Sequence, residues 1–456
     1  MALLTSLLEP TTLLLGSVLA LSLLWLKATR RPRGLPPGPG PALPLLGHLH
    51  LLEKDIRPVI EKWRRQYGDI ISFYMGSQLV VVLNGYDVIK DAFVKHADAF
   101  SDRPHMFITD EISKGKVVEG TAQGVAGGSA GAGIGQKRAG REDSGGGRSR
   151  FEYDDPTFTS YLRRVDQNVE ALTGAGLVTC FPWMRYLPGD LLKFKRTLTN
   201  VDAVNEELIK PRVRDHFNSF TDGEASDFIY AYIREMRKRE DSAQATTLDD
   251  ENLITTVGDL FVAGTESTST AISWAVVLLE NYPDAQEKCF QEIQRVIGTA
   301  RPPSMRDKPD LTYVEATIME VLRWANIAIF ALQHAVPYDV SFRGYTIPKE
   351  AMIMPNLESV LQDEQTWGDP LVFRPDRFIG PDGKLTRPDE FIPFGIGRRA
   401  CLGEPLARME LFLYISTMIQ QFQFLPPEPG QPPSLERQFG SVCSPKPFKV
   451  RAVPRD

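Results

Sequence analysis

A glycine-rich loop that ends in a single cysteine, at the expected start of a helix, constrains this chain more than any other feature. Residues 394–404 read Phe-Gly-Ile-Gly-Arg-Arg-Ala-Cys-Leu-Gly-Glu. The positive field at a helix N-terminus and the nearby backbone N–H groups favour a thiolate, the form of cysteine that binds metals. The loop therefore predicts that Cys401 is a metal ligand. The alternative is a core cysteine that lies beside a helix cap.

Four other residues of the loop suit a flat ring that is bound to the same metal. Glycine at positions 397 and 403 removes side chains where such a ring has to approach the backbone closely. Arg399 can pair with a carboxylate of the ligand, and Phe394 can cover the sulfur and keep water away from it. The residues predicted to contact a cofactor here are Phe394, Gly397, Arg399 and Gly403.

A second cluster lies in the middle of a long apolar helix, predicted over residues 250–282 and stopping before Pro283. A glycine and a run of hydroxyl residues are unfavourable inside a helix. The cluster reads Ala263-Gly264-Thr265-Glu266-Ser267-Thr268. It can open a groove in which Glu266 and the hydroxyl groups beside it act as general acid and base groups. The alternative is a notch against which another helix packs.

A glutamate and an arginine three residues apart, Glu320 and Arg323, lie on one face of a predicted helix and can pair. By itself such a pair is usually solvated and worth less than about 1 kcal/mol. Residues 373–378 supply a second arginine, Arg377, which can complete a buried network. The pair is informative because it is followed along the chain by residues 373–378 and then by the cysteine loop.

The cysteine loop matches the cysteine-ligand loop of the cytochrome P-450 family in its phenylalanine, glycines, arginine and cysteine. Residues 263–268 resemble the family's oxygen-activating motif, which usually has threonine where Ser267 stands. The resemblance implies the mainly α fold of that family, with a small β region, and haem b as cofactor. It implies Cys401 as the axial iron ligand, because a thiolate pushes electron density onto the iron and favours O–O cleavage.

The same resemblance assigns the remaining candidate residues. Ala263 and Gly264 would contact the haem, and Glu266, Ser267 and Thr268 would be the catalytic residues. His334 stands where the microsomal relatives have a basic residue on a haem propionate. The three residues of the charge network would lock the core around the haem loop: Glu320, Arg323 and Arg377.

The resemblance is to family-two microsomal enzymes, and it implies the reaction and the partners. Such enzymes insert one atom of dioxygen into lipophilic substrates, here a fatty acid, a steroid or a foreign compound. The electrons come from NADPH through a membrane-bound reductase, with cytochrome b5 as a second expected partner. The net charge of −6 gives no reason to expect nucleic acid as a partner.

Two other functions stay open. One is a catalytically inactive paralogue or splice form that binds haem or lipid and lacks part of the haem pocket. The other is a haem-thiolate isomerase, which needs no external electrons. The predicted relay of Glu266 and Ser267 argues against the isomerase, since such an enzyme does not have to deliver protons to dioxygen.

The N-terminal residues predict a membrane anchor. Residues 1–26 are almost entirely apolar, and Lys27, Arg30, Arg31 and Arg33 follow at once, which favours a cytosolic body on the endoplasmic reticulum membrane. A cleaved signal peptide is the alternative. Residues 27–48 form a basic, proline-rich hinge, expected to be a stiff linker that holds the body away from the bilayer. Residues 49–456 would form the haem-binding domain.

A low-complexity segment at residues 119–149 interrupts that domain. Eleven of the chain's 36 glycines fall between Gly120 and Gly147, so the segment cannot bury enough apolar surface to order itself. The family relatives carry two helices here, with a tryptophan and an arginine that bind haem propionates, whereas this chain has no tryptophan between Trp63 and Trp183. The segment is interpreted as a gene-prediction artefact, a splice form or a genuine insert.

Local patterns predict several elements. Residues 70–73 and 79–83 are predicted to be strands joined by a turn at Gly76-Ser77, and residues 342–345 to be a second tight hairpin. Residues 402–422 are predicted to be a helix, with Pro405 in its first turn, where proline is tolerated.

Overall fold

The computed structural model describes residues 31–105, 111–112, 154–165, 167–168, 181–186, 189–190, 192–221, 227–242 and 246–455. The chain divides into two compact units. The first draws on Met1–Pro104, Phe330–Thr366 and Gly395–Arg399, and the second on His105–Ile329, Trp367–Phe394 and Ala400–Asp456. The described residues are mainly helical with small sheets, so the predicted fold class is confirmed.

The first unit combines short helices with two small sheets. Its elements are η1 (Leu49–Leu51), α3 (Arg57–Tyr67), β1 (Ile70–Met75), β2 (Gln78–Leu83), α4 (Tyr86–Lys90), η2 (Asp91–Lys95), α5 (Ala97–Phe100), β3 (His334–Ala335), β4 (Val340–Phe342), β5 (Tyr345–Ile347), β6 (Met352–Pro355), α15 (Glu358–Leu361) and α16 (Glu364–Trp367). Four strands form one sheet in the order β1-β2-β6-β3, and β4 pairs with β5.

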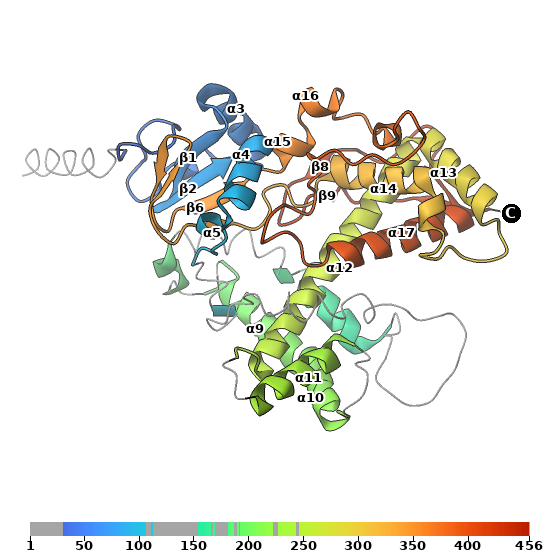
Figure 1. Ribbon diagram of the computed structural model, residues 1–456, viewed down its shortest axis with the longest axis horizontal. Coiled ribbons are helices and arrows are strands. Elements are labelled where there is room, and N and C mark those ends of the chain that lie inside the picture. Colours follow the sequence, from blue (N-terminus) through green and yellow to red (C-terminus); the bar gives the residue numbers. More distant parts are fainter. Residues whose placement is uncertain are drawn as a thin grey trace, which may run out of the picture. The chain divides into compact units, whose positions relative to one another are not determined.

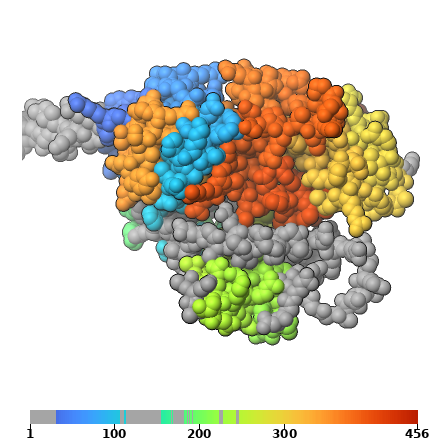
Figure 2. Space-filling view, in the orientation of Figure 1, coloured from blue at the N-terminus to red at the C-terminus, as the bar shows by residue number. Residues whose placement is uncertain are grey.

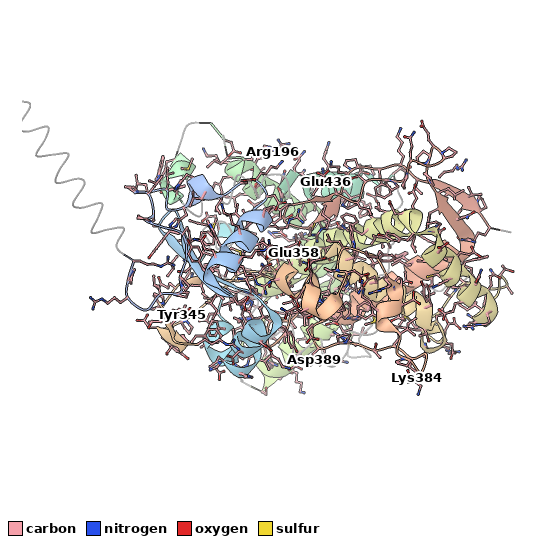
Figure 3. All side chains as sticks on the ribbon, turned by 90° about the horizontal axis from the view of Figure 1, so that it is seen from above. Arg196, Tyr345, Glu358, Lys384, Asp389 and Glu436 are labelled. Carbon is pink, nitrogen blue, oxygen red and sulfur yellow. The ribbon has the colours of Figure 1, made fainter. Side chains whose placement is uncertain are left out.

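Both predicted hairpins are present in this unit. Between β1 and β2, Met75 pairs with Gln78, and Gly76 has a φ of 60°, which glycine adopts without strain. Between β4 and β5, Arg343 and Gly344 both have positive φ, as a tight two-residue turn requires. Tyr345, labelled in Figure 3, begins β5 directly after this turn.

The proline-rich hinge is attached to the strands of the first unit. The N–H of Ser72 on β1 donates to the carbonyl oxygen of Pro37 at 2.8 Å, and the N–H of Thr346 on β5 donates to Gly34 at 2.7 Å. A side chain at Gly38 would lie 1.9 Å from the carbonyl oxygen of Ser72. Residues 34–38 therefore supply hydrogen-bond acceptors to strands of the first unit, and the role of residues 27–48 as a spacer stays a prediction.

The second unit contains the longer helices. Its labelled elements are η3 (Pro182–Tyr186), α9 (Phe194–Val204), η4 (Asn205–Ile209), α10 (Lys210–Asn218), α11 (Phe228–Asp241), α12 (Asp250–Asn281), α13 (Pro283–Val296), η5 (Lys308–Asp310), α14 (Thr312–Ala325), η6 (Pro375–Phe378), α17 (Glu404–Gln421), β7 (Phe422–Leu425), β8 (Arg437–Gln438), β9 (Ser444–Pro445) and β10 (Arg451–Pro454). A further helix of this unit includes residues 156–165.

Helix α12 runs through the second unit (Figure 1). Asp249 caps its start by accepting a hydrogen bond from the N–H of Asn252 at 2.7 Å, and the helix ends before Pro283 as predicted. Its C-terminal half packs against α14 and α17, and its N-terminal half against α10 and α11. Figure 2 shows residues of α10 and α11, in green, gathered in one group.

Helix α17 follows the cysteine loop, but it begins at Glu404, two residues later than predicted. Pro405 lies in its first turn as expected. Within the described residues, no helix combines the length and apolar character needed to cross a bilayer. The predicted anchor at residues 1–26 and the glycine-rich segment at 119–149 both lie outside the described residues.

Candidate active site

The loop of Cys401 is closed by its own backbone. The N–H of Cys401 donates to the carbonyl oxygen of Phe394 at 2.9 Å, and the N–H of Glu404 donates to the carbonyl oxygen of Cys401 at 3.3 Å. Asp389, labelled in Figure 3, lies on the segment that leads into this loop. The residue Cys401 is exposed, whereas Cys289 and Cys443 are buried. Among these three described cysteines, only Cys401 is accessible to a ligand.

Burial and two neighbouring residues set the pKa of the Cys401 thiol. Protein packed against one side of the sulfur raises this pKa, and the charge of Glu404 acts in the same direction, whereas the backbone N–H groups of Gly403 and Glu404 lower it. The net direction is upward. In the chain without a ligand, burial therefore outweighs the backbone N–H groups at the start of α17, and the thiolate stays a prediction for the ligand-bound protein. A bound cation would supply the missing positive charge, because a coordinating thiol is deprotonated.

Phe394 and the first turn of α17 are joined by an arginine. The guanidinium of Arg408 lies 5.1 Å from the centre of the Phe394 ring, and its Nε donates to Glu404 at 2.7 Å. This pair holds the side of the loop that carries Phe394 against the helix that follows Cys401. The predicted cover of Phe394 over the sulfur stays a prediction.

The two loop glycines are required for different reasons. A Cβ at Gly397 would lie 2.1 Å from the carbonyl oxygen of Phe93, and its φ is 83°. The protein's own backbone is therefore a sufficient reason for glycine at 397, and the predicted contact of Gly397 with a cofactor stays a prediction. At Gly403 a Cβ would lie 3.8 Å from the sulfur of Cys401, an ordinary contact distance. Glycine at 403 thus leaves the space beside the sulfur open.

Glu320, Arg323 and Arg377 lie together in the second unit. Two nitrogens of Arg323 donate to the carboxylate of Glu320 at 2.7 and 2.8 Å, and Nε of Arg377 donates to the same carboxylate at 3.0 Å. Glu320 and Arg323 are 0% exposed. Arg323 also donates to the carbonyl oxygen of Pro370 at 2.8 Å, and Arg377 to that of Trp367 at 2.7 Å. These contacts tie α14 to the segment 367–378 that precedes the cysteine loop.

The cluster in α12 is part of a continuous helix. Ala263 and Gly264 are exposed, and a Cβ added at Gly264 would meet open space. The hydroxyl of Ser267 donates to the carbonyl oxygen of Ala263 at 2.6 Å, and that of Thr265 to Phe261 at 2.7 Å. The predicted groove is therefore not a break in the helix. The Ser267 hydroxyl would have to rotate away from Ala263 to donate a proton elsewhere.

Thr268 contacts a residue that the sequence pattern did not single out. Its hydroxyl is hydrogen-bonded to the carboxyl of Glu410 on α17, and this bond lowers the pKa of Glu410 while burial raises it more. The pKa of Glu410 is therefore higher than usual. Glu410 follows Cys401 by nine positions, so one helix connects the metal-ligand candidate to the α12 cluster. A glutamate inside a helix carries no sequence signal for such a contact.

Three basic side chains meet in the first unit. Nε of Arg399 donates to the carbonyl oxygen of Ser101 at 2.9 Å, and Nη1 of Arg103 donates to that of Gln333 at 2.8 Å. The pKa of Arg103 is lowered to about 10 by burial and by the charge of Arg399. His334 lies close enough for both arginines to lower its pKa. The hydrogen bonds described for Arg103 and Arg399 go to backbone carbonyls, so an anionic ligand group would complete this cluster.

Arg103 was missed in the sequence. It belongs to the stretch Phe100-Ser101-Asp102-Arg103-Pro104, more than two hundred residues before its neighbours His334 and Arg399. The candidate residues are thus divided between the two units. Gly397, Arg399 and His334 belong to the first unit. The second unit holds Ala263, Gly264, Glu266, Ser267, Thr268, Glu320, Arg323, Arg377, Phe394, Cys401 and Gly403.

His334 is expected to make folding sensitive to acid. Burial, assisted by Arg103 and Arg399, lowers its pKa to about 4 from 6.5, and its side chain is 6% exposed. The unfolded chain then binds more protons below pH 6.5, so stability falls as the pH falls. Between pH 7 and 5 we expect a loss of about 2 kcal/mol in the free energy of unfolding without haem, measured by urea denaturation.

The matched variant is His334→Asn, which cannot titrate. Asparagine can keep a donor toward the carbonyl oxygen of Phe100, which Nδ1 of His334 approaches at 2.8 Å. Between pH 7 and 5, the free energy of unfolding should fall less in the variant than in the parent, by a difference of at least about 1 kcal/mol. Equal losses in the two proteins would contradict the assignment of this pH dependence to His334.

The sequence was compared with known protein families to identify the family of this chain. The family described as Cytochrome P450 matches residues 36–122 and 148–452. The chain belongs to the cytochrome P450 family. This P450 is therefore a member of a monooxygenase family whose cofactor is a haem with a thiolate ligand and whose members depend on a redox partner.

Full-length relatives agree with this P450 assignment. Cytochrome P450 2U1 of Homo sapiens is 33% identical, with 96% of this chain and 92% of the relative covered. Cytochrome P450 2C23 of Rattus norvegicus is 32% identical, with 98% and 99% covered. Steroid 17-alpha-hydroxylase/17,20 lyase of Oryzias latipes is 32% identical, with 96% and 95% covered. The similarity is thus to family-2 P450s and to a steroid hydroxylase.

The P450 match breaks within the glycine-rich segment. Residues 123–147 fall between the two matched blocks. The alignment with the human 2U1 enzyme has 507 positions, more than the 456 residues of this chain, so positions of the relative are left without a counterpart. The break coincides with the change of composition that begins near Gly120.

Proposed function

We propose that this P450 is a haem-thiolate monooxygenase that inserts one atom of dioxygen into a lipophilic substrate, with Cys401 as the iron ligand. The observation that carries the proposal is the exposed residue Cys401 in a closed loop just before α17. When bound there, haem b supplies a redox-active iron that activates dioxygen. Cys401 would hold the iron, and the iron's charge would keep the sulfur deprotonated.

The basic cluster of the first unit supports haem as the ligand. Arg103, Arg399 and His334 form an electropositive group that suits the carboxylates of a porphyrin. Arg399 precedes Cys401 by two positions, a span of at most about 7 Å along the backbone. We assign Arg399 to a carboxylate of the ligand and Cys401 to its iron. His334 would gain a proton at Nε2 as it binds a propionate, since Nδ1 faces Phe100.

We assign the proton-handling residues to α12. Glu266 would act as the acid, and the hydroxyls of Ser267 and Thr268 as groups that pass protons toward the oxygen substrate. Ala263 and Gly264 would leave room for dioxygen and the cofactor, since they carry little or no side chain. The charge network of Glu320, Arg323 and Arg377 would hold the segment before the cysteine loop in place. Phe394 would exclude water from the sulfur.

Substrate and partners follow from the family and the N-terminus. The Oryzias latipes relative is a steroid hydroxylase, which supports a steroid or another lipophilic compound as the substrate. Electrons would come from NADPH through a membrane-bound reductase, with cytochrome b5 as a second donor. The apolar residues 1–26 and the basic residues that follow would anchor the chain in the endoplasmic reticulum membrane with its body in the cytosol.

The proposal is tested on the purified full-length chain. Haem is added during expression, the protein is reduced, carbon monoxide is bound and the Soret band is recorded. A red-shifted, thiolate-type band together with reductase-dependent hydroxylation of a steroid or fatty acid is the expected result. A protein that binds no haem, or that binds it without a thiolate, would rule the proposal out.

A serine in the α12 cluster gives a sharper prediction. Ser267→Ala should lower the amount of product formed per NADPH by about 10- to 100-fold and increase peroxide release, because proton delivery by a positioned group contributes on that order or more. The matched control is Ser273→Ala, because the Ser273 hydroxyl donates to Ser269 at 2.9 Å as Ser267 does to Ala263. Equal amounts of product per NADPH in the two variants would show that Ser267 is not part of the relay.

A second candidate function is favoured by the break in the family match. A P450 without the residues that relatives carry at 123–147 could bind haem weakly or only lipid, and act without oxygenase activity. Our interpretation of residues 119–149 is an artefact of gene prediction, with a splice form or a genuine insert as the alternatives. Sequencing the transcript decides between them, since an in-frame message that encodes this segment excludes the artefact.

A further inference from the structure

A buried tyrosine contacts the α12 cluster from the side of a neighbouring helix. Tyr161 lies on the helix of residues 156–165, whose start is capped by Asp155 through the N–H groups of Thr157 and Phe158. Its side chain is 2% exposed, and its ring packs edge-on against Phe261 with the ring centres 6.2 Å apart. Burial of a phenol group in this way requires a hydrogen-bond partner for the hydroxyl.

That partner is Thr265. The hydroxyl oxygens of Tyr161 and Thr265 are 3.5 Å apart. The Thr265 hydroxyl donates its own hydrogen bond to the carbonyl oxygen of Phe261 at 2.7 Å. Thr265 is therefore the acceptor, and Tyr161 is the donor. The resulting chain runs from the phenol through the threonine hydroxyl to the backbone of α12. It fixes the Thr265 rotamer and the turn of helix on which Thr265 lies.

Glu266 follows Thr265 directly, and its charge reaches the same phenol. The pKa of Tyr161 is raised by burial first, lowered by the hydrogen bond with Thr265, and raised again by the charge of Glu266. The phenol thus stays protonated at neutral pH and keeps its proton available for Thr265. The tyrosine, the threonine and the glutamate form one electrostatically connected group on α12.

We propose that Tyr161 is a positioning residue for the Thr265–Glu266 turn of α12, and through it for the acid that delivers protons. The inference rests on the proposed function for its catalytic consequence. Its structural part, a donor that holds Thr265 in place, is independent of haem. Tyr161 would not touch substrate or cofactor, and the carboxylate of Glu266 would remain the proton donor.

Tyr232 offers a matched control. It is 1% exposed, belongs to the same hydrophobic cluster as Tyr161 and places its hydroxyl 3.5 Å from the carbonyl oxygen of Asp249. That oxygen lies at the N-terminal cap of α12, far along the helix from Glu266. Tyr161→Phe and Tyr232→Phe therefore delete the same group, at the same distance, from two different turns of one helix.

The first measurement is amide hydrogen exchange of the full-length chain. Tyr161→Phe should accelerate exchange over residues 261–269 by about two- to tenfold, the value of one hydrogen bond, and leave residues 250–257 unchanged. Tyr232→Phe should show the reverse pattern. Thr265→Val should reproduce the effect of Tyr161→Phe, whereas Thr265→Ser should not. Unchanged exchange over 261–269 in Tyr161→Phe would overturn the inference.

The second measurement is the yield of product per NADPH as a function of pH. Tyr161→Phe should lower this yield by about two- to tenfold with little change in KM and should shift the pH at half-maximal yield, whereas Tyr232→Phe should not. Altered exchange with an unaltered pH profile would overturn the positioning role. A parent protein without a thiolate-type carbon monoxide spectrum would instead refute the proposed function, and the exchange result would still decide whether Tyr161 holds Thr265.

Discussion

Replacing Cys401 with serine is expected to abolish the thiolate-type carbon monoxide spectrum and all monooxygenase activity. Serine keeps the size of the side chain and its place before α17, but an alcohol does not supply the electron density of a thiolate. The described residues contain no group of three or more His, Cys, Asp or Glu side chains that could hold the metal instead. The loss is read from the Soret band at equal protein concentration.

The control for this variant is Cys289→Ala. Cys289 is buried on α13, and its sulfur lies 3.2 Å from the hydroxyl of Thr317, away from any candidate ligand residue. Its replacement should lower stability and leave the spectrum of the folded protein unchanged. A thiolate-type band that survives in Cys401→Ser, or disappears in Cys289→Ala while the protein stays folded, would show that the iron ligand has been misassigned.

Replacing Arg323 with alanine is expected to cost about 3–5 kcal/mol in the free energy of unfolding. The pair of Glu320 and Arg323 is entirely buried, and removal of one partner leaves a buried carboxylate with Arg377 as its remaining charged neighbour. A loss of this size exceeds what most single substitutions cause, and it should prevent haem retention near body temperature. Urea denaturation of the two proteins at pH 7 measures it.

An exposed pair provides the comparison. Glu61 and Arg65 on α3 are 2.9 Å apart, with side chains 42% and 80% exposed, so Glu61→Gln should cost less than about 1 kcal/mol. The double variant Glu320→Leu/Arg323→Met should be less harmful than Arg323→Ala, because it removes the buried carboxylate together with its partner and Arg377 keeps its ion pair with Asp369. A loss under 1 kcal/mol in Arg323→Ala would mean that the network does not hold the fold together.

Elements with local signals were predictable from the sequence. Gly76 marks the turn between β1 and β2, and Gly344 marks the turn between β4 and β5, because a positive φ favours glycine. Pro283 ends α12, since the residue before a proline avoids helical backbone angles. The cysteine loop and the glutamate–arginine pair were predictable for the same reason, because their residues are close together in the chain.

Features that depend on distant segments were not predictable. Gly397 is required by the carbonyl oxygen of Phe93, roughly three hundred positions earlier, and no pattern near residue 397 indicates that contact. Arg103 joins Arg399 and His334 in the same way. The packing that raises the pKa of Cys401 in the ligand-free chain was not predictable either, because the start of a helix is visible in the sequence and the packing around a sulfur is not.

The hydrogen bonds of residues 34–38 have a consequence for truncated forms of the enzyme. A chain shortened at its N-terminus to improve solubility keeps the acceptor for Ser72 as long as Pro37 is present, and a cut beyond Pro37 removes it. Arg31 also reaches the Ser72 hydroxyl, so an expression form should begin no later than that arginine. Shorter forms would expose one margin of β1 to pairing between molecules and to aggregation.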